Sequence, residues 1–225
     1  MLLVLGITGS LLMVWALQKA VENTFTKETF SPVQVTPNGF VLPMTIPGTT
    51  LQAIEMSAYE GPFLEEDYGQ EVVNIAALHV YNTGEREVRS AGITLRTEKG
   101  SFVFYGEHFP PGETVVLLEI HTAPYEKATI TDCTGWQEIS NQAQVEGLII
   151  TDKDNGTLVV TNTTGKTLHN LCLYYKAWLS PPDVYMGGVT HSVYVPILAP
   201  GQTEMLCPER YATGFSKVVC AYADP

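Results

Sequence analysis

The chain has 225 residues, a length suited to one large domain or two small ones. Hydrophobic residues make up 45% of it and charged residues 16%, with a mean hydropathy of +0.07, so it is neither a disordered polar chain nor a multi-span membrane protein. Twelve Lys and Arg residues against 24 Asp and Glu residues give a formal net charge of -12. A surface of that sign repels phosphate backbones, which argues against nucleic-acid binding.

The N-terminal segment predicts a single transmembrane anchor. Residues 1–18 carry no charged side chain, and a helix of this length reaches about 27 Å, close to the hydrocarbon thickness of a bilayer. Trp15 lies near the end of this apolar run and Lys19 follows it, as expected at a membrane interface. A cleaved signal peptide and a buried core helix remain as alternatives. The anchor is favoured over the signal peptide because no basic residue precedes the run and Gln18 stands where cleavage after Ala20 needs a small residue.

Beyond residue 18 the pattern predicts an all-β protein. Residues 19–38 are polar and contain turn signals, which indicates a short stalk. Short runs of β-branched and aromatic residues then alternate with turn residues, and no amphipathic helical stretch of useful length interrupts them. The expected strands are residues 50–59, 72–82, 92–97, 102–105, 114–120, 128–133, 147–151, 157–161, 168–175, 189–195, 203–207 and 217–222.

Two stretches of the chain repeat the same features in the same order. Each has an Asn-Thr turn after an apolar strand, a further apolar strand, a Pro-Gly turn before Glu or Gln, and a closing strand with one cysteine. Asn and Gly tolerate positive φ at such turns, and Pro presets the chain for a tight turn. The matched features are Asn82 and Asn162, residues 93–96 and 171–174, Gly112 and Gly201, and Cys133 and Cys220.

The repeat predicts two tandem β-sandwich domains. Residues 136–144 lose strand alternation and become polar, so the first domain is expected at residues 39–136 and the second at residues 145–225. Each copy would be an antiparallel sandwich of the immunoglobulin/fibronectin-like kind, with the alternating apolar residues of its strands in a shared core.

The second copy resembles a known family. Its Asn-Thr turn, the strand at residues 168–175 and the turn at residues 198–203 are similar to the FxLYD type of bacterial extracytoplasmic sandwich domain. Leu173 and Tyr174 stand at the Leu and Tyr of that motif, while Leu171 and Tyr175 replace its Phe and Asp. The resemblance covers about a third of the chain. It implies a sandwich fold and a cell-surface setting, and it carries over no catalytic residue.

Two acidic stretches raise the question of a metal site. Residues 65–67, Glu-Glu-Asp, could form a metal or acid-base site with His79 or His108, but contiguous carboxylates between turn signals favour a solvated loop. Residues 152–156 resemble the start of a calcium loop, yet Gly156 comes one residue too early for that pattern. The flanking apolar runs, with Asn155-Gly156 between them, favour a β-hairpin with a primed turn instead.

No local motif indicates catalysis or a cofactor. The five histidines lack metal-ligand spacing, and no nucleophile elbow, Walker loop or dinucleotide fingerprint is present. We therefore expect no catalytic residue, no cofactor and no metal. Four cysteines leave the disulfide pairing open, with one bond plausible among Cys172, Cys207 and Cys220.

A candidate partner-binding surface lies where the two copies differ in length. The stretch from Asn82 to Pro111 is nine residues shorter than the one from Asn162 to Pro200, and the surplus falls at residues 178–188. Insertions in sandwiches go to loops, and aromatic loops are typical of recognition surfaces. The candidates are Trp178, Tyr185 and Met186; the alternative is that Trp178 and Tyr185 close the sandwich core.

The sequence as a whole favours a membrane-anchored, extracytoplasmic binding, adhesion or envelope-assembly module without catalytic activity. Its expected partners are the membrane, through residues 1–18, and a protein or another component of the cell envelope. The alternatives are a structural spacer in an envelope complex and a metal-dependent hydrolase built from the acidic loop and dispersed histidines.

Overall fold

The computed structural model describes residues 40–65 and 70–224, and the fold in these residues is all β, as expected. Each of the expected strands is present, and a short β1 precedes them. One 3-10 turn, Asp154–Gly156, is the helical element of the described chain. The strands are β1 Met44–Thr45, β2 Leu51–Pro62, β3 Glu71–Asn82, β4 Val88–Thr97, β5 Ser101–Phe109, β6 Thr114–Leu118, β7 Ile130–Ile139, β8 Leu148–Lys153, β9 Thr157–Asn162, β10 Leu168–Leu179, β11 Val184–Leu198, β12 Thr203–Leu206 and β13 Ser216–Asp224.

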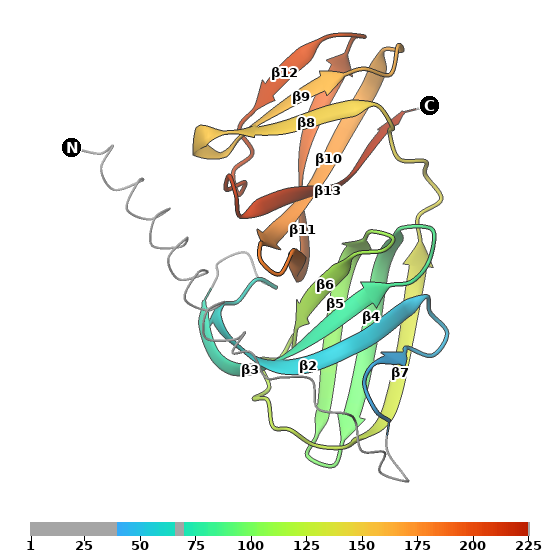
Figure 1. Cartoon of the computed structure of the whole chain (residues 1–225), viewed down its shortest axis with the longest axis vertical. Helices are drawn as coiled ribbons and strands as arrows, with labels where there is room; N and C mark the ends of the chain where they lie inside the picture. The colour runs from blue at the N-terminus through green and yellow to red at the C-terminus, as the bar shows by residue number, and fades with distance from the viewer. Residues whose placement is uncertain (1–39, 66–69, 225) are drawn as a thin grey trace, which may run out of the picture.

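The strands form three sheets, one of which runs through the whole molecule (Figure 1). The seven-stranded sheet has the order β1-β2-β3-β6-β11-β10-β13, and the two smaller sheets have the orders β5-β4-β7 and β12-β9-β8. All neighbouring strands pair antiparallel except β6 and β11, which pair parallel at Tyr185 with Val115 and at Met186 with Val116. Below, the first unit means β1 to β7 and the second unit means β8 to β13.

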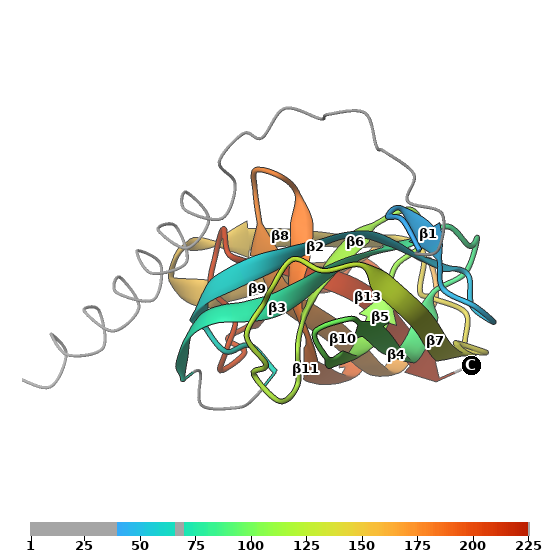
Figure 2. The same cartoon turned by 90° about the horizontal axis from the view of Figure 1, so that it is seen from below.

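In each unit a three-stranded sheet packs against part of the large sheet. Seen from below in Figure 2, β2 and β3 run on one side of the first unit while β4 and β5 run on the other. Side chains from both sheets fill the core between them, with Leu78, Ile93 and Phe104 almost completely buried. The second unit has a smaller core that includes Val160, Leu171 and Leu198. Burial of these alternating apolar side chains, worth about 25 cal/mol per Å2 of apolar surface, is the main stabilising contribution.

The Asn-Thr turns of the repeat form the same hydrogen-bonded corner in both units. The side-chain amide of Asn82 donates to the carbonyl oxygens of Arg86 and Phe109, both at 2.9 Å. Its backbone carbonyl accepts from the Gly112 N–H at 2.9 Å, and its Oδ1 accepts from the Gly84 N–H at 2.9 Å. The Asn82 side chain is fully buried, so each of these bonds satisfies a group that water cannot reach.

The corner of the second unit repeats these bonds 80 positions later. The amide of Asn162 donates to the carbonyls of Lys166 at 2.7 Å and Leu198 at 2.8 Å. Its carbonyl accepts from the Gly201 N–H at 2.8 Å, and its Oδ1 accepts from the Thr164 N–H at 2.9 Å. The repeated turns inferred from the sequence are therefore confirmed as structurally equivalent.

The structure corrects the alignment of the next strand of the repeat. Val88 and Leu168 each follow the corner Asn by six residues and lie opposite the residues that accept its amide, so equivalent residues of β4 and β10 are also 80 positions apart. Buried and partly buried positions alternate in the same phase along residues 91–95 and 171–175. The matching of residues 93–96 with 171–174 was wrong by two residues because both alignments place apolar residues at alternate positions.

The closing cysteines of the repeat are not equivalent. Cys133 lies opposite Leu95, on the core side of the small sheet, whereas Cys220 lies opposite Tyr174, on the outer side of the large sheet. The residue of the first unit that corresponds to Cys220 is Thr134. This difference brings a thiol to the surface between the units.

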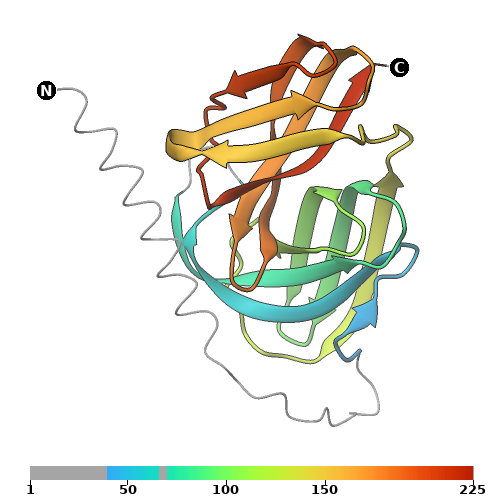
Figure 3. The same cartoon turned by 45° about the horizontal axis from the view of Figure 1, so that its top comes forward.

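The additional residues of the second unit extend a strand pair and do not form a loop. Residues 178–188 comprise the ends of β10 and β11 and the turn between them, which corrects the expectation of a long loop. Figures 1 and 3 show the tip of this hairpin reaching beside β6 in the first unit. Its polar turn and two Pro residues resemble a loop in sequence, but main-chain pairing with β6 and β13 keeps the flanking residues extended.

The region expected to separate the domains is also more ordered than its composition indicates. β7 continues from Ile130 to Ile139 and includes Trp136, because the strand pairs with β4 along its whole length. As the edge of the small sheet, it alternates polar and apolar residues weakly, which hides the strand pattern. The chain then reaches β8 through residues 140–147.

The expected anchor, residues 1–18, and the expected stalk, residues 19–38, lie outside the described residues. Within residues 40–65 and 70–224, no helix has the length and apolar character needed to cross a membrane.

Candidate functional site

The three candidate partner-binding residues lie where the second unit contacts the first. Tyr185 and Met186 pair with β6 and are almost completely buried, at 3% and 7% exposure. Trp178 is partly buried and packs edge-on against Tyr185, with ring centroids 4.8 Å apart, and the Lys217 ammonium lies 3.8 Å from the Trp178 ring centroid. Their aromatic surface is thus used inside the chain, and contact of Trp178 with another molecule stays a prediction.

The structure does not bring together the residues considered for a metal or acid-base site at the acidic loop. Glu65 accepts hydrogen bonds from the backbone N–H groups of Leu118 at 2.8 Å and Gly188 at 2.7 Å. His79 has Ser57 as a partner, and His108 has Glu87. Glu65 is therefore a tether between the units and not part of a solvated loop, while residues 66–67 lie outside the described residues.

A buried lysine reinforces this tether. Lys176 is fully buried, and its ammonium donates to the carbonyl oxygens of Gly187 at 3.0 Å, Gly188 at 2.7 Å and Val189 at 3.4 Å. Burial lowers the pKa of Lys176 to about 8, against the opposing attraction of Glu65. The same strand segment thus receives a carboxylate on its N–H side and an ammonium on its carbonyl side. Glu65 holds the segment against the first unit, and Lys176 holds it within the hairpin.

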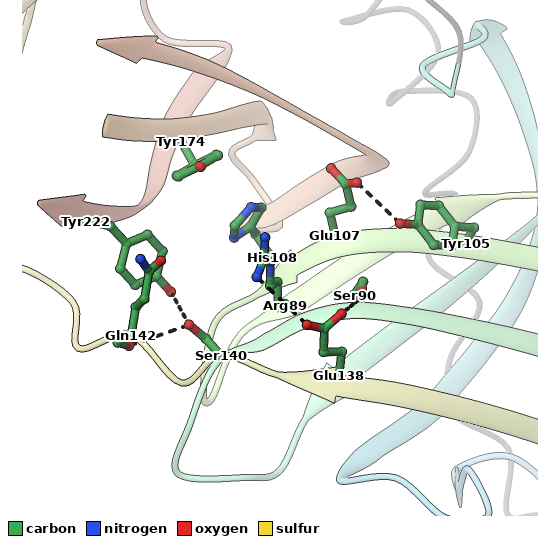
Figure 4. A pocket seen from close by; sticks show the side chains of 10 residues that line it. All are labelled: Arg89, Ser90, Tyr105, Glu107, His108, Glu138, Ser140, Gln142, Tyr174 and Tyr222. Carbon is green, nitrogen blue, oxygen red and sulfur yellow. Dashed lines mark hydrogen bonds and ion pairs between the residues drawn. The ribbon is translucent and has the colours of Figure 1, made fainter. Parts of the chain in front are cut away.

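A polar cavity of about 390 Å3 lies between the two units (Figure 4). The first unit contributes Arg89, Glu107 and Glu138 from the ends of β4, β5 and β7, and the second contributes Tyr174 and Tyr222 from β10 and β13. In Figure 4 these side chains come from facing strands and surround a common space. The volume is sufficient for a side chain or a small polar ligand.

An open aromatic face of the first unit adjoins this cavity, which Tyr105 lines. Trp136 and Tyr105 are 53% and 39% exposed, and their ring centroids are 6.2 Å apart. Gly92 lies between them, because a Cβ at that position would be only 2.4 Å from the Trp136 Nε1. The pair therefore lies on the outer side of the small sheet, in contact with solvent.

Carboxylates flank the aromatic pair. Glu107 accepts a hydrogen bond from the Tyr105 hydroxyl at 3.3 Å, and Glu138 lies 3.8 Å from the Arg89 guanidinium in an exposed ion pair. Burial, with the charges of Glu107 and then Glu138, raises the pKa of Tyr105. The face thus combines aromatic rings with a local excess of negative charge.

A second feature between the units is a buried cluster of three chemically different side chains. Glu87 precedes β4, His108 lies near the end of β5, and Cys220 lies on β13. The His108 Nδ1 is in a short hydrogen bond with the Glu87 Oε1 at 2.5 Å and lies 3.3 Å from the Cys220 Sγ. The Cys220 Sγ donates to the same carboxylate oxygen at 3.6 Å. All three residues are buried.

Neighbouring groups hold this cluster in place. The other carboxylate oxygen of Glu87 accepts hydrogen bonds from the Tyr222 hydroxyl and from the Gln144 amide, the latter at 3.0 Å. The Tyr174 ring lies against the His108 imidazole, with centroids 4.3 Å apart. Burial raises the pKa of Glu87, but the hydrogen bonds from His108 and Tyr222 outweigh that effect, so the pKa is lowered.

The cluster has the residue types of a cysteine nucleophile with its base and acid but not their arrangement. A relay requires the imidazole to meet the thiol and the carboxylate through different nitrogens, whereas the His108 Nδ1 meets both. Burial and the charge of Glu87 also raise the pKa of the Cys220 thiol, which disfavours the nucleophilic thiolate. The Glu87 Oε1, His108 Nδ1 and Cys220 Sγ are better placed to bind a ligand together than to transfer a proton in sequence.

The other cysteines do not take part. All four cysteines lie in the described part of the chain and none forms a disulfide: Cys133 is buried, Cys172 is partly buried and Cys207 is exposed. The disulfide considered for the second unit is therefore not formed. In the β13 pairing, Cys172 lies opposite Tyr222 and not opposite Cys220.

Sequence reasoning missed the cavity and the cluster. Glu87, His108 and Cys220 are separated by 21 and 112 residues and share no motif, so no local spacing signals the site. The one indication in the sequence is the additional residues 178–188 of the second copy. They predict a contact surface, but they do not show that the first unit is what this surface contacts.

Comparisons with known proteins assign neither a family nor a function to the chain. No protein-family model matches the chain, and no curated protein matches it either.

Proposed function

We propose that the protein is a membrane-anchored, extracytoplasmic binding module in which two immunoglobulin/fibronectin-like sandwiches present one open sheet face to a protein of the cell envelope. Residues 1–18 would supply the anchor and the described residues the binding part. The resemblance of the second copy to FxLYD-type domains supports the extracytoplasmic setting. Adhesion or envelope assembly would follow from this binding, without a catalytic step.

One observation carries the proposal: the exposed pair of Tyr105 and Trp136 lies beside two carboxylates, and Tyr105 lines the polar cavity. Exposed aromatic rings on a rigid sheet supply contact area at a low cost in conformational entropy. Aromatic residues are also enriched in protein interfaces.

The charges of the face favour a basic partner segment. Lys and Arg side chains are attracted to the faces of Trp and Tyr rings as well as to carboxylates, and the net charge of -12 would steer a basic segment toward the protein. Glu107 and Glu138 are the carboxylates at this place, and Arg89 is the neighbouring cation. The proposed ligand is therefore an exposed, lysine- or arginine-rich segment of another protein.

Binding of a lysine-rich heptapeptide to the full chain, followed by fluorescence anisotropy, tests the recognition. We expect binding that weakens with salt, at least 10-fold weaker binding to Trp136→Ala, and weaker binding to Glu107→Gln. Tyr194→Ala is a matched control, because Tyr194 is the β11 counterpart of Tyr105 and is 53% exposed. A glutamate-rich heptapeptide controls for charge. Equal binding to the wild type and Trp136→Ala would overturn this use of the face and favour a spacer.

Protease accessibility of a C-terminal tag in intact cells tests the location separately. Cleavage from outside, with detergent needed for extraction and Met1 retained, supports the anchored extracytoplasmic topology. Complete protection before lysis, with cleavage after it, would contradict that topology.

A further inference from the structure

We propose that Glu87, His108 and Cys220 bind a divalent transition-metal ion of the zinc type between the two units. A carboxylate oxygen, an imidazole nitrogen and a sulfur lie within 4.8 Å of one another at this place. Zinc binds all three kinds of ligand, whereas calcium and magnesium bind oxygen and select against sulfur. The mixed ligand set therefore identifies the class of ion.

The separations of the ligand atoms fit a tetrahedral site on two of its three edges. With ordinary zinc bond lengths, a nitrogen–sulfur or oxygen–sulfur edge of a tetrahedron is about 3.6 Å and a nitrogen–oxygen edge about 3.3 Å. The His108 Nδ1 lies 3.3 Å from the Cys220 Sγ, and the Glu87 Oε1 lies 3.6 Å from it. The remaining edge, Nδ1 to Oε1, is 2.5 Å because a hydrogen bond closes it. An ion that replaces this hydrogen bond needs that edge to open by about 0.8 Å and the nitrogen–sulfur edge by about 0.3 Å.

Surrounding groups orient the ligands as they do in known metal sites. Metal-binding carboxylates are usually fixed by hydrogen bonds to their second oxygen. The Glu87 Oε2 is held in this way by Tyr222 and Gln144, which leaves Oε1 directed at His108 and Cys220. The Tyr174 ring, which packs against the imidazole at a tilt of 30°, restricts the orientation of His108.

The site would keep one coordination position for water. Three protein ligands leave a tetrahedral ion one ligand short, and His108 also lines the polar cavity, from which a water molecule can complete the coordination. On binding, the Cys220 thiol loses its proton to solvent, and the imidazole proton of His108 moves from Nδ1 to Nε2. The Nδ1 lone pair is then free for the ion, and the hydrogen bond to Glu87 is replaced by two metal bonds.

The ion would join the two units. Glu87 and His108 belong to the first unit and Cys220 to the second, so an ion bound to all three closes a bridge that hydrogen bonds now make. Binding to the folded state alone stabilises that state in proportion to the logarithm of free metal concentration. A rise in the unfolding temperature on metal addition is thus an expected consequence.

Cobalt(II) titration of the full chain, stripped with a chelator and kept reduced, tests the proposal. We expect one cobalt per chain, a thiolate-to-cobalt charge-transfer band, tetrahedral d–d absorption, and displacement by zinc. Zinc should also raise the unfolding temperature, and a chelator should reverse the rise. Absence of the charge-transfer band in the wild type would overturn the site.

Matched variants separate this site from other thiols and histidines. Cys220→Ser should lose the band, whereas Cys207→Ser, which removes an exposed thiol, should keep it. Tyr222→Phe retains all three ligands and should bind cobalt about 10-fold to 100-fold more weakly with the band intact. If Cys220→Ser does not fold, His108→Gln with circular dichroism as the folding control replaces it. A band that persists in the folded Cys220→Ser or is lost in Cys207→Ser would contradict the assignment.

Discussion

The two units of the repeat share their corners and differ in what covers their outer faces. In the first unit, Trp136 and Tyr105 flank Gly92 on a face that is open to solvent. The corresponding residues of the second unit, Tyr222 and Tyr194, flank Cys172, and the Tyr222 side of that face is covered by the first unit. The same outer face therefore makes an internal contact in the second unit and is open to solvent in the first unit.

The difference arises from the length of one hairpin. β4 and β5 end in a short turn, whereas β10 and β11 continue until the hairpin tip pairs with β6. Because the hairpin tip lies beside β6, Glu65 can bind Gly188, and the cluster of Glu87, His108 and Cys220 can form between the units. The comparison teaches that the nine additional residues are structural in the first place, and that the proposed binding surface lies in the shorter copy.

The largest expected effect is that of removing the buried ammonium at the hairpin. Lys176 is equivalent to Arg96, which lies on the surface 3.5 Å from Asp132. Lys176→Met leaves three carbonyls and Glu65 without their cation, so we expect a loss of about 3 to 5 kcal/mol in the free energy of unfolding. Arg96→Met should change it by less than about 1 kcal/mol. Urea unfolding of both variants measures this contrast, and equal effects would contradict the structural role of Lys176.

The next effect tests whether the corners are equivalent in energy as well as in geometry. Asn82→Ala and Asn162→Ala each remove a fully buried amide with two donated bonds. We expect each to cost about 2 to 3 kcal/mol because the carbonyl acceptors are left unpaired. Thermal or urea unfolding should give costs within about 1 kcal/mol of each other. A neutral Asn162→Ala would show that the second corner is dispensable.

A smaller effect is expected where the hairpin passes closest to the first unit. A Cβ on Gly188 would lie 2.0 Å from the backbone oxygen of Tyr105, whereas a Cβ on Gly100 would meet nothing within 4 Å. Gly188→Ala should therefore cost about 1 to 3 kcal/mol through displaced backbone. Gly100→Ala is the control, with a change within about 0.5 kcal/mol. The same unfolding measurement applies, and an unchanged Gly188→Ala would place the hairpin further from β5.

The smallest expected effect is a difference in acid sensitivity. Burial lowers the pKa of His79 from 6.5, against the opposing charge of Glu55, while the equivalent residue of the second unit is Val159. Because the unfolded chain then takes up the proton more readily, the contribution of His79 to stability is complete above pH 6.5 and is lost as the pH falls below that value. His79→Gln should flatten this part of the pH profile. An unchanged slope between wild type and variant would assign the acid sensitivity to other groups.

Features set by neighbouring residues could be predicted from the sequence, and features set by tertiary contact could not. The corners at Asn82 and Asn162 and the β8–β9 hairpin follow from local turn chemistry, and the structure confirms them. The expected primed turn at Asn155-Gly156 is wrong, because the hairpin loop has three residues, Asp154–Gly156, in a 3-10 turn. The sequence predicts a linker at Trp136 because an edge strand shows weak alternation. The cluster of His108 and Cys220 depends on how two repeats meet, which periodicity within either repeat does not encode.

The parallel pairing of β6 with β11 also has a consequence for synthesis of the chain. Val115 and Tyr185 are 70 positions apart, so the first unit emerges with the edge of β6 unpaired until the second unit is well advanced. An open strand edge is a template for pairing with another chain. A hairpin from a neighbouring nascent copy presents the same residues to that edge as the chain's own hairpin does. Crowded synthesis would therefore favour exchanged dimers, in which each copy completes the sheet of the other.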